Sequence, residues 1–493
     1  MFSIHRFDKL IYEHLDVYIL ICSNISTVIT SVFFIYFVLS LILYKFTNIH
    51  TNSFFKNSLL FFYWGFILIL WIFFVLKLYI TFKLLNIYDV NLVVLLHEWD
   101  VSWNASRLGD TLIFLCLTTL LTSWIFLSER YINSNCFHTT YFFIFVVFTI
   151  NMVYTNNLFI MFIFFEFIFL PSLFFVYVLG YSKKVEKTIK YLLLWTLSGS
   201  FLVLISLIYL YNISMDLTID TLKYIRFTNL EKNILFFCIF LGFGIKIPVW
   251  PFHYWLTKVH VEAPTGFSIF LSGYLVKTAL FCLIIFINFF KHCILGYLYI
   301  TIIIWGIIDA SIRMWTSTDI KRLIAFATIQ EMNLIMFFGF FSDYTNYQIF
   351  NIFIIMHGIL SSLLFFLVDQ VQKRYQSRNL LSLSGLVHKF LNLSIAIWLG
   401  LLIFRGFPIF IKFIIEWEFL VYLYEHWGIY GILIFFITTV FSVIGFARVW
   451  FTVLYGQPLH NSIIGTDMLK TDKFIALVLI SFITFLSIFL CFF

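Results

Sequence analysis

Long apolar runs separated by short polar stretches make up most of the chain. A membrane-spanning helix needs about 20 mainly apolar residues, and fourteen segments meet that rule. They are 26–46, 58–83, 109–128, 139–155, 157–180, 188–212, 232–256, 265–290, 297–315, 320–342, 346–370, 391–423, 427–455 and 473–493. The runs are continuous, without the two-residue alternation of a transmembrane β-barrel. The pattern therefore predicts an all-α polytopic membrane protein with about fourteen spanning helices.

Two of these spans are irregular. The span 232–256 contains two prolines, Pro248 and Pro251, and proline interrupts a helix by removing an N–H donor and clashing with the preceding turn. The span 391–423 is too long for one crossing and contains the stretch FRGFPIFIKFIIEWEF. Both are predicted to be discontinuous helices, which polytopic transporters place near their ion sites.

Composition supports the membrane interpretation. The 493 residues are 62% hydrophobic and only 11% charged, whereas soluble domains carry about 25% charged residues. Charge this scarce cannot cover a surface in water. The net charge of +7 lies mainly in short loops, so membrane topology explains it and no nucleic-acid partner is expected. The first residues, MFSIHRFDKLIYEHLD, are too charged for a cleavable signal and lack an Arg- and Ser-rich transit pattern, so we expect a directly inserted or mitochondrially encoded protein.

The lysines and arginines are distributed unequally between the two predicted faces of the membrane. One side receives Lys45, Lys56, Arg130, Lys183, Lys184, Lys187, Lys190, Lys258, Arg313, Lys321, Arg322, Lys373, Arg374, Arg378, Lys470 and Lys473. The other side receives Arg6, Lys9, Lys83, Arg107, Lys223, Arg226 and Lys291. The positive-inside rule places the richer side in the matrix or cytoplasm. Both termini are then predicted on the opposite, intermembrane-space face.

Sequence motifs for bound cofactors are missing from the chain. The seven cysteines, at positions 22, 116, 136, 238, 282, 293 and 491, form no CxxC pair. Their scatter speaks against an iron–sulfur or zinc site, and their odd number against a disulfide framework. The sequence also has no GxGxxG or P-loop lysine motif. We therefore expect this chain to bind no cofactor and no metal.

Four ionisable residues fall well inside predicted spans, namely Glu166, Lys246, Lys277 and Glu416. A charge at mid-membrane costs at least about 2.5–3.5 kcal/mol on insertion scales, so such residues face a partner or water. One interpretation is a structural ion pair, for example Glu166 with Lys246. The other, favoured by four such residues together, is a path for protons or ions.

Weaker candidates accompany these four. Glu331 also lies in the middle of a predicted span and, like Glu166, is a candidate for a functional charge in the membrane. His357 is mid-span as well, and its sequence fits a packing histidine as readily as a proton relay. His253 and His260 flank the end of a span, where interfacial histidines are common. Asp319 precedes a predicted helix and is expected to cap it.

Several segments, in this order, resemble a known family. They are FFEFIFLPS, WTLSGS, GFGIKIPVWPFHYWLTKVHVEAP, LSGYLVKTALF, TDIKRLIAFATIQEMNLI and MHGILSSLLFFLVDQVQKRYQSR. They look like the antiporter-like membrane-arm subunits of respiratory complex I, which are related to the large Mrp sodium/proton antiporter subunits. The resemblance runs from about residue 157 to 425. The HVEAP element with two spaced intramembrane lysines is its most specific part.

The resemblance implies a fold of fourteen helices with two inverted five-helix repeats, in which helices 7 and 12 are broken. Residues 1–137 would hold helices 1–3, and residues 138–260 the first inverted repeat, where helices 4–8 begin. Residues 261–425 would form the second half with helices 8–12. Residues 426–493 would add helices 13 and 14.

The family's proton pathway maps onto the four buried charges. By that resemblance Glu166 would modulate Lys246 in the uptake half-channel, Lys277 would connect the two halves, and Glu416 would serve the exit. His357 matches the histidine of the eleventh helix. Within the family, a glutamate at position 416 favours the subunit 4 branch, because subunits 2 and 5 usually carry lysine there.

Three positions depart from the family pattern. Glu331 stands where a histidine is expected, which leaves two alternatives: a carboxylate replaces the histidine in the relay, or the path bypasses this position. Thr257 replaces a common proline. Lys412 stands where a small or polar residue is usual, four residues before Glu416, and this helical spacing lets the two pair. We hypothesise that Lys412 tunes the exit carboxylate.

The function implied is that of a proton-translocating membrane-arm subunit of NADH:ubiquinone oxidoreductase in the mitochondrial inner membrane. NADH, FMN, iron–sulfur clusters and ubiquinone would be bound by other subunits, with no redox centre in this chain. Its partners would be the other membrane-arm subunits, especially the antiporter-like subunits 2 and 5, together with lipids. The alternatives are an Mrp-like cation/proton antiporter subunit and a scaffold whose pumping has decayed.

Overall fold

A computed structural model describes residues 100–130, 135–179, 185–225, 227–289, 296–341, 346–455 and 467–491. The predicted spans 26–46 and 58–83 lie outside these ranges. Each of the twelve other predicted spans contains helix. In the first half the elements are α4 (Asp100–Arg130), α5 (Asn135–Tyr154), α6 (Leu158–Leu179), α7 (Val185–Ser214), α8 (Ile219–Lys223), α9 (Asn229–Lys246), α10 (Tyr254–Glu262), α11 (Thr265–Phe270), the π-helical turn η3 (Leu271–Leu275) and α12 (Val276–Phe289).

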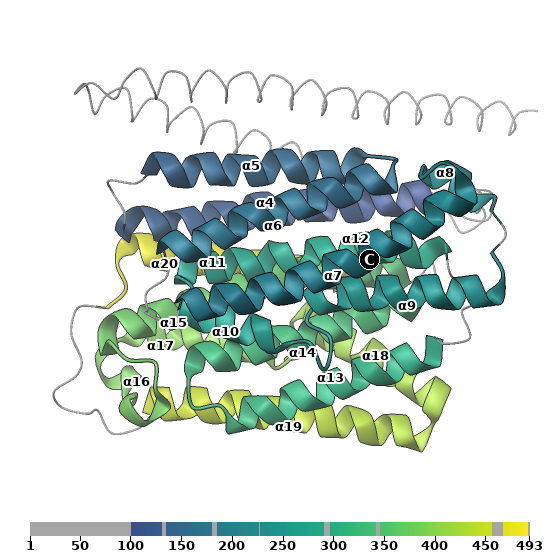
Figure 1. The fold of residues 1–493 in the computed structure, drawn as a ribbon. Coiled ribbons are helices and arrows are strands. Elements are labelled where there is room, and N and C mark those ends of the chain that lie inside the picture. Colours follow the sequence, from purple (N-terminus) through teal and green to yellow (C-terminus); the bar gives the residue numbers. More distant parts are fainter. Residues whose placement is uncertain are drawn as a thin grey trace, which may run out of the picture.

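The second half is equally helical. Its elements are α13 (Gly296–Thr316), α14 (Ile320–Phe341), α15 (Asn346–Tyr375), η4 (Leu380–Ser382), α16 (Leu386–Lys389), α17 (Leu391–Phe404), α18 (Ile411–Trp427), α19 (Ile429–Tyr455) and α20 (Lys470–Cys491). The long helices run side by side (Figure 1). Within the described ranges, six helical segments are long and apolar enough to cross a membrane. The described part of the chain is therefore that of a polytopic helical membrane protein.

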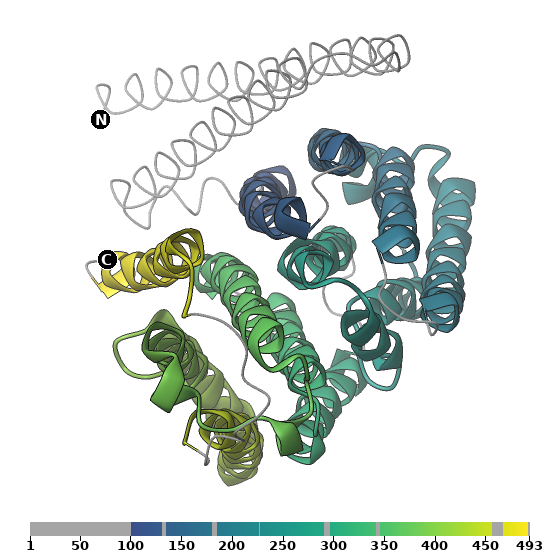
Figure 2. The same ribbon diagram turned by 90° about the vertical axis from the view of Figure 1, so that its left-hand side faces the viewer.

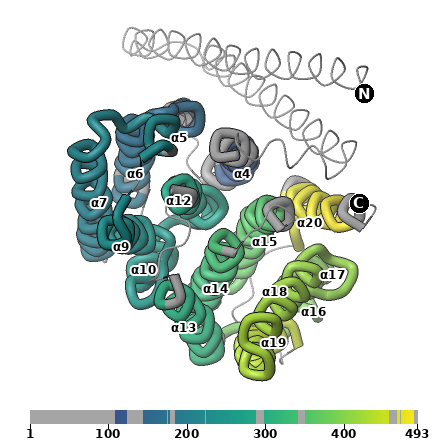
Figure 3. Tube along the Cα trace, turned by 90° about the vertical axis from the view of Figure 1, so that its right-hand side faces the viewer, coloured from purple at the N-terminus to yellow at the C-terminus, as the bar shows by residue number. Residues whose placement is uncertain are grey.

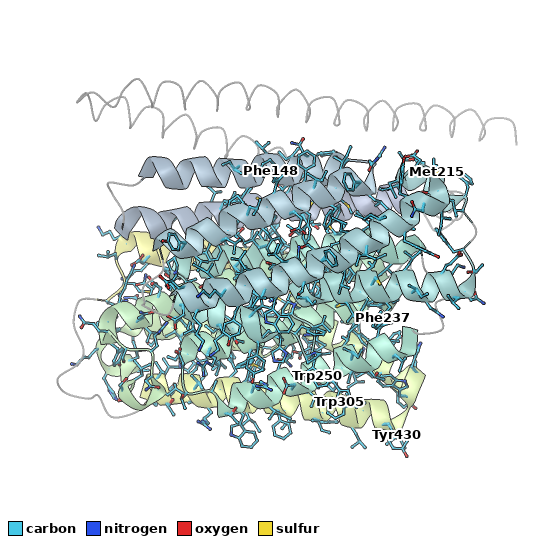
Figure 4. All side chains as sticks on the ribbon, viewed as in Figure 1. Phe148, Met215, Phe237, Trp250, Trp305 and Tyr430 are labelled. Atoms are coloured by element: carbon cyan, nitrogen blue, oxygen red, sulfur yellow. The ribbon has the colours of Figure 1, made fainter. Side chains whose placement is uncertain are left out.

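The bundle has a buried middle and two exposed edges. Seen end-on in Figure 3, α5, α6 and α7 form one edge and α17, α18 and α19 the other, with α12, α14 and α15 between them. Figure 2 shows the same arrangement from the opposite end. The apolar segments of α12 and α15 are buried throughout, whereas no more than a third of those of α7 and α19 is buried. Large apolar side chains such as Trp305 and Tyr430 project from the outside (Figure 4), as lipid or a neighbouring membrane subunit requires.

The break predicted in the span 232–256 is present. Helix α9 begins with a capping box, in which the Thr228 hydroxyl accepts from the Glu231 N–H and the Glu231 carboxylate accepts from the Thr228 N–H. It ends at Lys246, immediately before the proline-rich stretch. Helix resumes as α10 and continues to Glu262, beyond the predicted end of the span. The buried Trp255 indole donates a hydrogen bond to the Ile245 carbonyl at 2.8 Å, which ties the two halves across the break.

The second predicted break is present too. Helix α17 ends at Phe404 and α18 begins at Ile411. Between them Gly406 has a φ of +65°, a left-handed conformation that glycine adopts without steric penalty. A Cβ atom on Gly406 would lie 2.7 Å from Glu416 Oε2, so glycine also makes room for the Glu416 carboxylate.

The predicted span 265–290 departs from a regular helix at η3, which the apolar pattern does not reveal. A π-helical turn inserts one extra residue and often marks a functional site. Here it brings Gly273 against α15, where a Cβ on Gly358 would lie 3.1 Å from the Gly273 carbonyl oxygen. The two glycines therefore allow the backbones of η3 and α15 to approach closely, one residue from His357.

Candidate functional site

Glu166 on α6 and Lys246 at the end of α9 form an ion pair. The Lys246 Nζ donates to Glu166 Oε1 at 2.5 Å. The lysine is fully buried, and its ammonium lies 4.2 Å from the ring centroid of Phe165 and 4.8 Å from that of Phe169, within cation–π range. The Glu166 side chain is 27% exposed. The pair thus connects an enclosed cation to a carboxylate that reaches the outer surface.

Lys277 lies in the first turn of α12, directly after the π-helical turn. Its Nζ donates a hydrogen bond to the Ser272 carbonyl in η3. The side chain is fully buried, and its charge interacts with those of Glu331 and His357. Helix α12 contacts both α9 and α14. Lys277 therefore lies on the element between the Lys246 pair and the charged residues of the second half.

Glu331 on α14 and Lys412 on α18 form a second buried ion pair. The Lys412 Nζ donates to Glu331 Oε1 at 2.5 Å and lies 3.8 Å from the centroid of the Phe404 ring. The same Nζ lies 3.9 Å from Glu416 Oε1. The contact expected from the four-residue spacing is therefore present, but Glu331, 81 positions away, is the closer partner.

A small cavity opens beside these three residues. Its volume is about 20 Å³, and besides the charged groups it is lined by the α19 hydroxyl residues Thr438, Thr439 and Ser442. That volume is enough for one water molecule. His357 Nε2 lies 4.0 Å from Glu331 Oε2, and neither ring nitrogen of His357 has a hydrogen-bond partner among the described residues. The second half therefore gathers protonatable groups around a small cavity whose lining is partly polar and partly apolar.

His253 belongs to a different cluster, at the start of α10. Its Nε2 lies 3.3 Å from Asp309 Oδ2, which also accepts from Arg313 Nε at 2.8 Å. Arg313 donates in addition to the Tyr254 hydroxyl at 2.8 Å. Sequence reasoning missed Asp309 and its role for Arg313. Their four-residue spacing within one span was the signal that could have revealed them.

His260 packs against an aromatic ring, and no ion pair of His260 is found among the described residues. Its ring stacks on Phe365 with centroids 4.8 Å apart, and its ring nitrogens have no hydrogen-bond partner in the part of the chain described. Nearby, the C-terminal end of α10 is held by two cations. Lys321 Nζ donates to the Ala263 carbonyl and Arg378 to the Val261 carbonyl, each at 2.5 Å. Cations at a helix C-terminus also complement its dipole.

The structure thus arranges the predicted residues in two groups. Glu166 and Lys246 form the first. Glu331, His357, Lys412 and Glu416 form the second, with Lys277 on the helix between. Asp319 accepts from the Lys321 N–H at 2.9 Å and so caps α14, as predicted. Ionisable groups inside a membrane bundle mark candidate paths for protons or ions.

Three comparisons with known proteins agree with one another. The family described as NADH:quinone oxidoreductase/Mrp antiporter, TM, matches residues 155–442. The chain is 35% identical to NADH-ubiquinone oxidoreductase chain 4 of Paramecium tetraurelia over 390 residues, which cover 77% of this chain and 82% of that one. It is 30% identical to the chain of the same name from Acanthamoeba castellanii over 434 residues, covering 85% and 84%.

The fold is similar to that of a solved structure as well. A chain in the structure of the Mrp complex from Dietzia sp. superimposes with a TM-score of 0.69, at 15% sequence identity, over 78% of this chain and 80% of that one. At this identity the likeness concerns the fold alone.

Proposed function

The chain belongs to the NADH:quinone oxidoreductase/Mrp antiporter transmembrane family, and from that premise we propose that it is a proton-translocating membrane-arm subunit of NADH:ubiquinone oxidoreductase. The observation that carries the proposal is the series of carboxylate and ammonium groups on α6, α9, α12, α14 and α18, of which only Glu166 and Glu416 are partly exposed. Charges are expensive to bury without a function or a partner. Here they follow one another across the middle of the bundle.

The first station would be the Glu166–Lys246 pair. At 4 Å and an effective dielectric of about 20, such a pair gains about 4 kcal/mol. Moving one charge against 100 mV takes about 2.3 kcal/mol. Opening and closing this one contact, 2.5 Å long in the structure, would therefore change the proton affinity of Lys246 by enough to drive one proton across the membrane.

The second half would receive and release the proton. Lys277 would pass it toward the group around Glu331 and His357, and Glu416, whose side chain is 27% exposed, would serve the exit. His253 and His260 would have smaller parts: His253 lies in the charged cluster with Asp309, and His260 is packed against Phe365.

The finer architecture belongs to the same proposal. It comprises fourteen helices with two inverted five-helix repeats, divided at residues 137, 260 and 425. The protein would sit in the mitochondrial inner membrane with both termini in the intermembrane space. It would contact other membrane-arm subunits, especially the antiporter-like subunits 2 and 5, while NADH, FMN, iron–sulfur clusters and ubiquinone stay with other subunits of the complex.

Substitution of the two central lysines tests this proposal. In the assembled complex reconstituted into vesicles, Lys246→Ala and Lys277→Ala are expected to lower NADH-driven proton pumping and, if coupling is tight, NADH oxidation as well. Lys258→Ala is the matched control, because Lys258 is an exposed lysine on α10. Assembled K246A or K277A complex that pumps at full stoichiometry would refute the roles of these lysines.

An Mrp-like cation/proton antiporter is the second candidate, because the description of the matching family includes the Mrp antiporter. It would need sodium and would have no electron donor. Purification from the native membrane distinguishes the two. An NADH-oxidising assembly of about a megadalton supports the first function, whereas a small complex with sodium-dependent proton exchange supports the second.

A further inference from the structure

One ammonium group lies within 4 Å of two carboxylates in the second half of the protein. Lys412 Nζ is 2.5 Å from Glu331 Oε1 and 3.9 Å from Glu416 Oε1. The two carboxylates come from different helices, α14 and α18, and they approach the ammonium at unequal distances. This asymmetry leaves the lysine with one close partner and one partner within reach of a small side-chain movement.

The charges of this trio do not balance. With all three groups ionised, two carboxylates and one ammonium leave a net charge of −1 in a buried site, which is unfavourable without compensation. Either the charge of Lys277, which acts on Glu331, or one proton held by the trio restores neutrality. The proton affinity of the trio therefore rises whenever Lys277 releases its proton and becomes neutral.

The surroundings give the trio an inner and an outer end. The Glu331 side chain is 2% exposed, and its Oε2 has no hydrogen-bond partner among the described residues and lies 4.0 Å from His357 Nε2. The Glu416 side chain is 27% exposed. The water-sized cavity and the hydroxyls of Thr438 and Ser442 lie beside the trio. A proton can thus arrive at Glu331 from the interior and leave from Glu416.

We propose that Glu331, Lys412 and Glu416 act as one proton-storing unit, in which the Lys412 ammonium moves between the two carboxylates. This deepens the proposed function and rests on it. With the ammonium on Glu331, Glu416 carries the proton on its carboxyl group. When the ammonium moves to Glu416, Glu416 releases its proton outward, and Glu331 Oε2 takes up a proton from the side of Lys277 and His357.

The return movement completes the cycle. The ammonium goes back to Glu331, and the Glu331 proton passes to Glu416 across the cavity, so that one proton enters and one leaves. In this scheme Glu331 and Lys412 are a functional pair. Glu331 carries the arriving proton. The position of the Lys412 ammonium determines which carboxylate is ionised and which one is protonated.

Four variants of the intact complex in vesicles test the unit. Lys412→Met leaves two carboxylates without their cation and is expected to lower the amount of assembled complex. Glu331→Gln keeps the ion pair of Lys412 with Glu416 and is expected to assemble. The double variant E331Q/K412M removes both charges and is expected to restore assembly. Lys412→Arg keeps the cation, but its planar fork can hold both carboxylates at once and so cannot alternate.

Proton pumping is the decisive measurement. Both E331Q/K412M and K412R are expected to assemble and to pump at least about tenfold more slowly than the unmodified complex, since a positioned proton carrier contributes a factor of about 100 or more. Glu418→Gln, a carboxylate on the same helix outside the trio, is the control and is expected to pump normally. Either E331Q/K412M or K412R pumping at the unmodified rate would overturn the proposal.

The outcome is separable from that of the proposed function. If K246A and K277A lose pumping while E331Q/K412M keeps it, the trio is a structural ion pair and the pathway stands without it. If all of these variants pump normally, the proposed function itself is wrong.

Discussion

Replacement of Gly406 by alanine should separate the position of the exit carboxylate from the stability of the fold. Gly406 lies in the break between α17 and α18 with a φ of +65°. A Cβ atom at this position would point toward the Glu416 carboxylate and would lie 2.7 Å from Oε2 and 3.1 Å from Cδ. The substitution therefore presses on a group assigned to proton release.

The magnitudes follow from this geometry. An alanine in the left-handed region costs about 1–2 kcal/mol of stability. To restore ordinary van der Waals contact at 3.4 Å, the Glu416 carboxylate must withdraw by about 0.7 Å. If its 3.9 Å separation from Lys412 grows by as much, the pair loses about 0.6 kcal/mol at an effective dielectric of about 20. That is roughly a threefold change in the proton-binding equilibrium of Glu416.

Gly428→Ala provides a matched control. Gly428 ends α18 with a φ of +56°, and a Cβ built there meets no atom within 4 Å. It incurs backbone strain of at least the same order without touching Glu416. Thermal stability of the assembled complex is expected to fall in both variants. Proton pumping per assembled complex is expected to fall by about threefold or more in G406A alone.

The comparison has a clear negative outcome. If G406A and G428A pump at the same rate per assembled complex, the position of the Glu416 carboxylate does not control proton release. The reasoning from the glycine contact would then be wrong, whatever the loss of stability.

Two further substitutions test local contacts. Trp255→Phe leaves the buried Ile245 carbonyl without its 2.8 Å hydrogen bond and is expected to cost about 1–3 kcal/mol in thermal unfolding, whereas Trp305→Phe on the outer surface should cost almost nothing. Burial raises the pKa of Asp467, but hydrogen bonds from Asn392 and Met468 outweigh it and hold the net pKa below its usual value. The stability from this carboxylate is therefore present above about pH 3.9 and lost as the pH falls through the lower folded-state pKa. Asp467→Asn should lower the melting temperature at neutral pH by an amount that shrinks at acid pH, and an unchanged difference at all pH values would contradict this.

Much of the architecture follows from local sequence. Apolar runs of about 20 residues locate the helices, and Pro248 and Pro251 predict the break that follows Lys246. The Glu166–Lys246 contact was one of two interpretations of these buried charges, because an intramembrane lysine needs a nearby carboxylate or water. These inferences use only the spacing of residues and the solvation of charge.

The remaining features depend on contacts between distant segments. The four-residue spacing predicts that Lys412 meets Glu416, but it cannot show that Glu331 on α14 is closer. The π-helical turn before Lys277 likewise leaves no mark in an apolar run, since it depends on how closely η3 and α15 approach. The charge of Arg313 placed it on the basic side of the membrane, but its ion pair with Asp309, one turn earlier in α13, was not predicted.

The attachment of α10 has a consequence for the order in which the protein is made. This nine-residue helix is too short to cross a bilayer alone. The cations that bind its last carbonyls, Lys321 and Arg378, follow their acceptors by 58 and 117 residues. At about 5–20 residues per second, the ribosome needs on the order of 10 s to supply the second one. The carbonyls at the C-terminal end of α10 therefore have neither cation during synthesis until α14 and the segment after α15 have emerged, although Trp255 can already tie α10 to the end of α9.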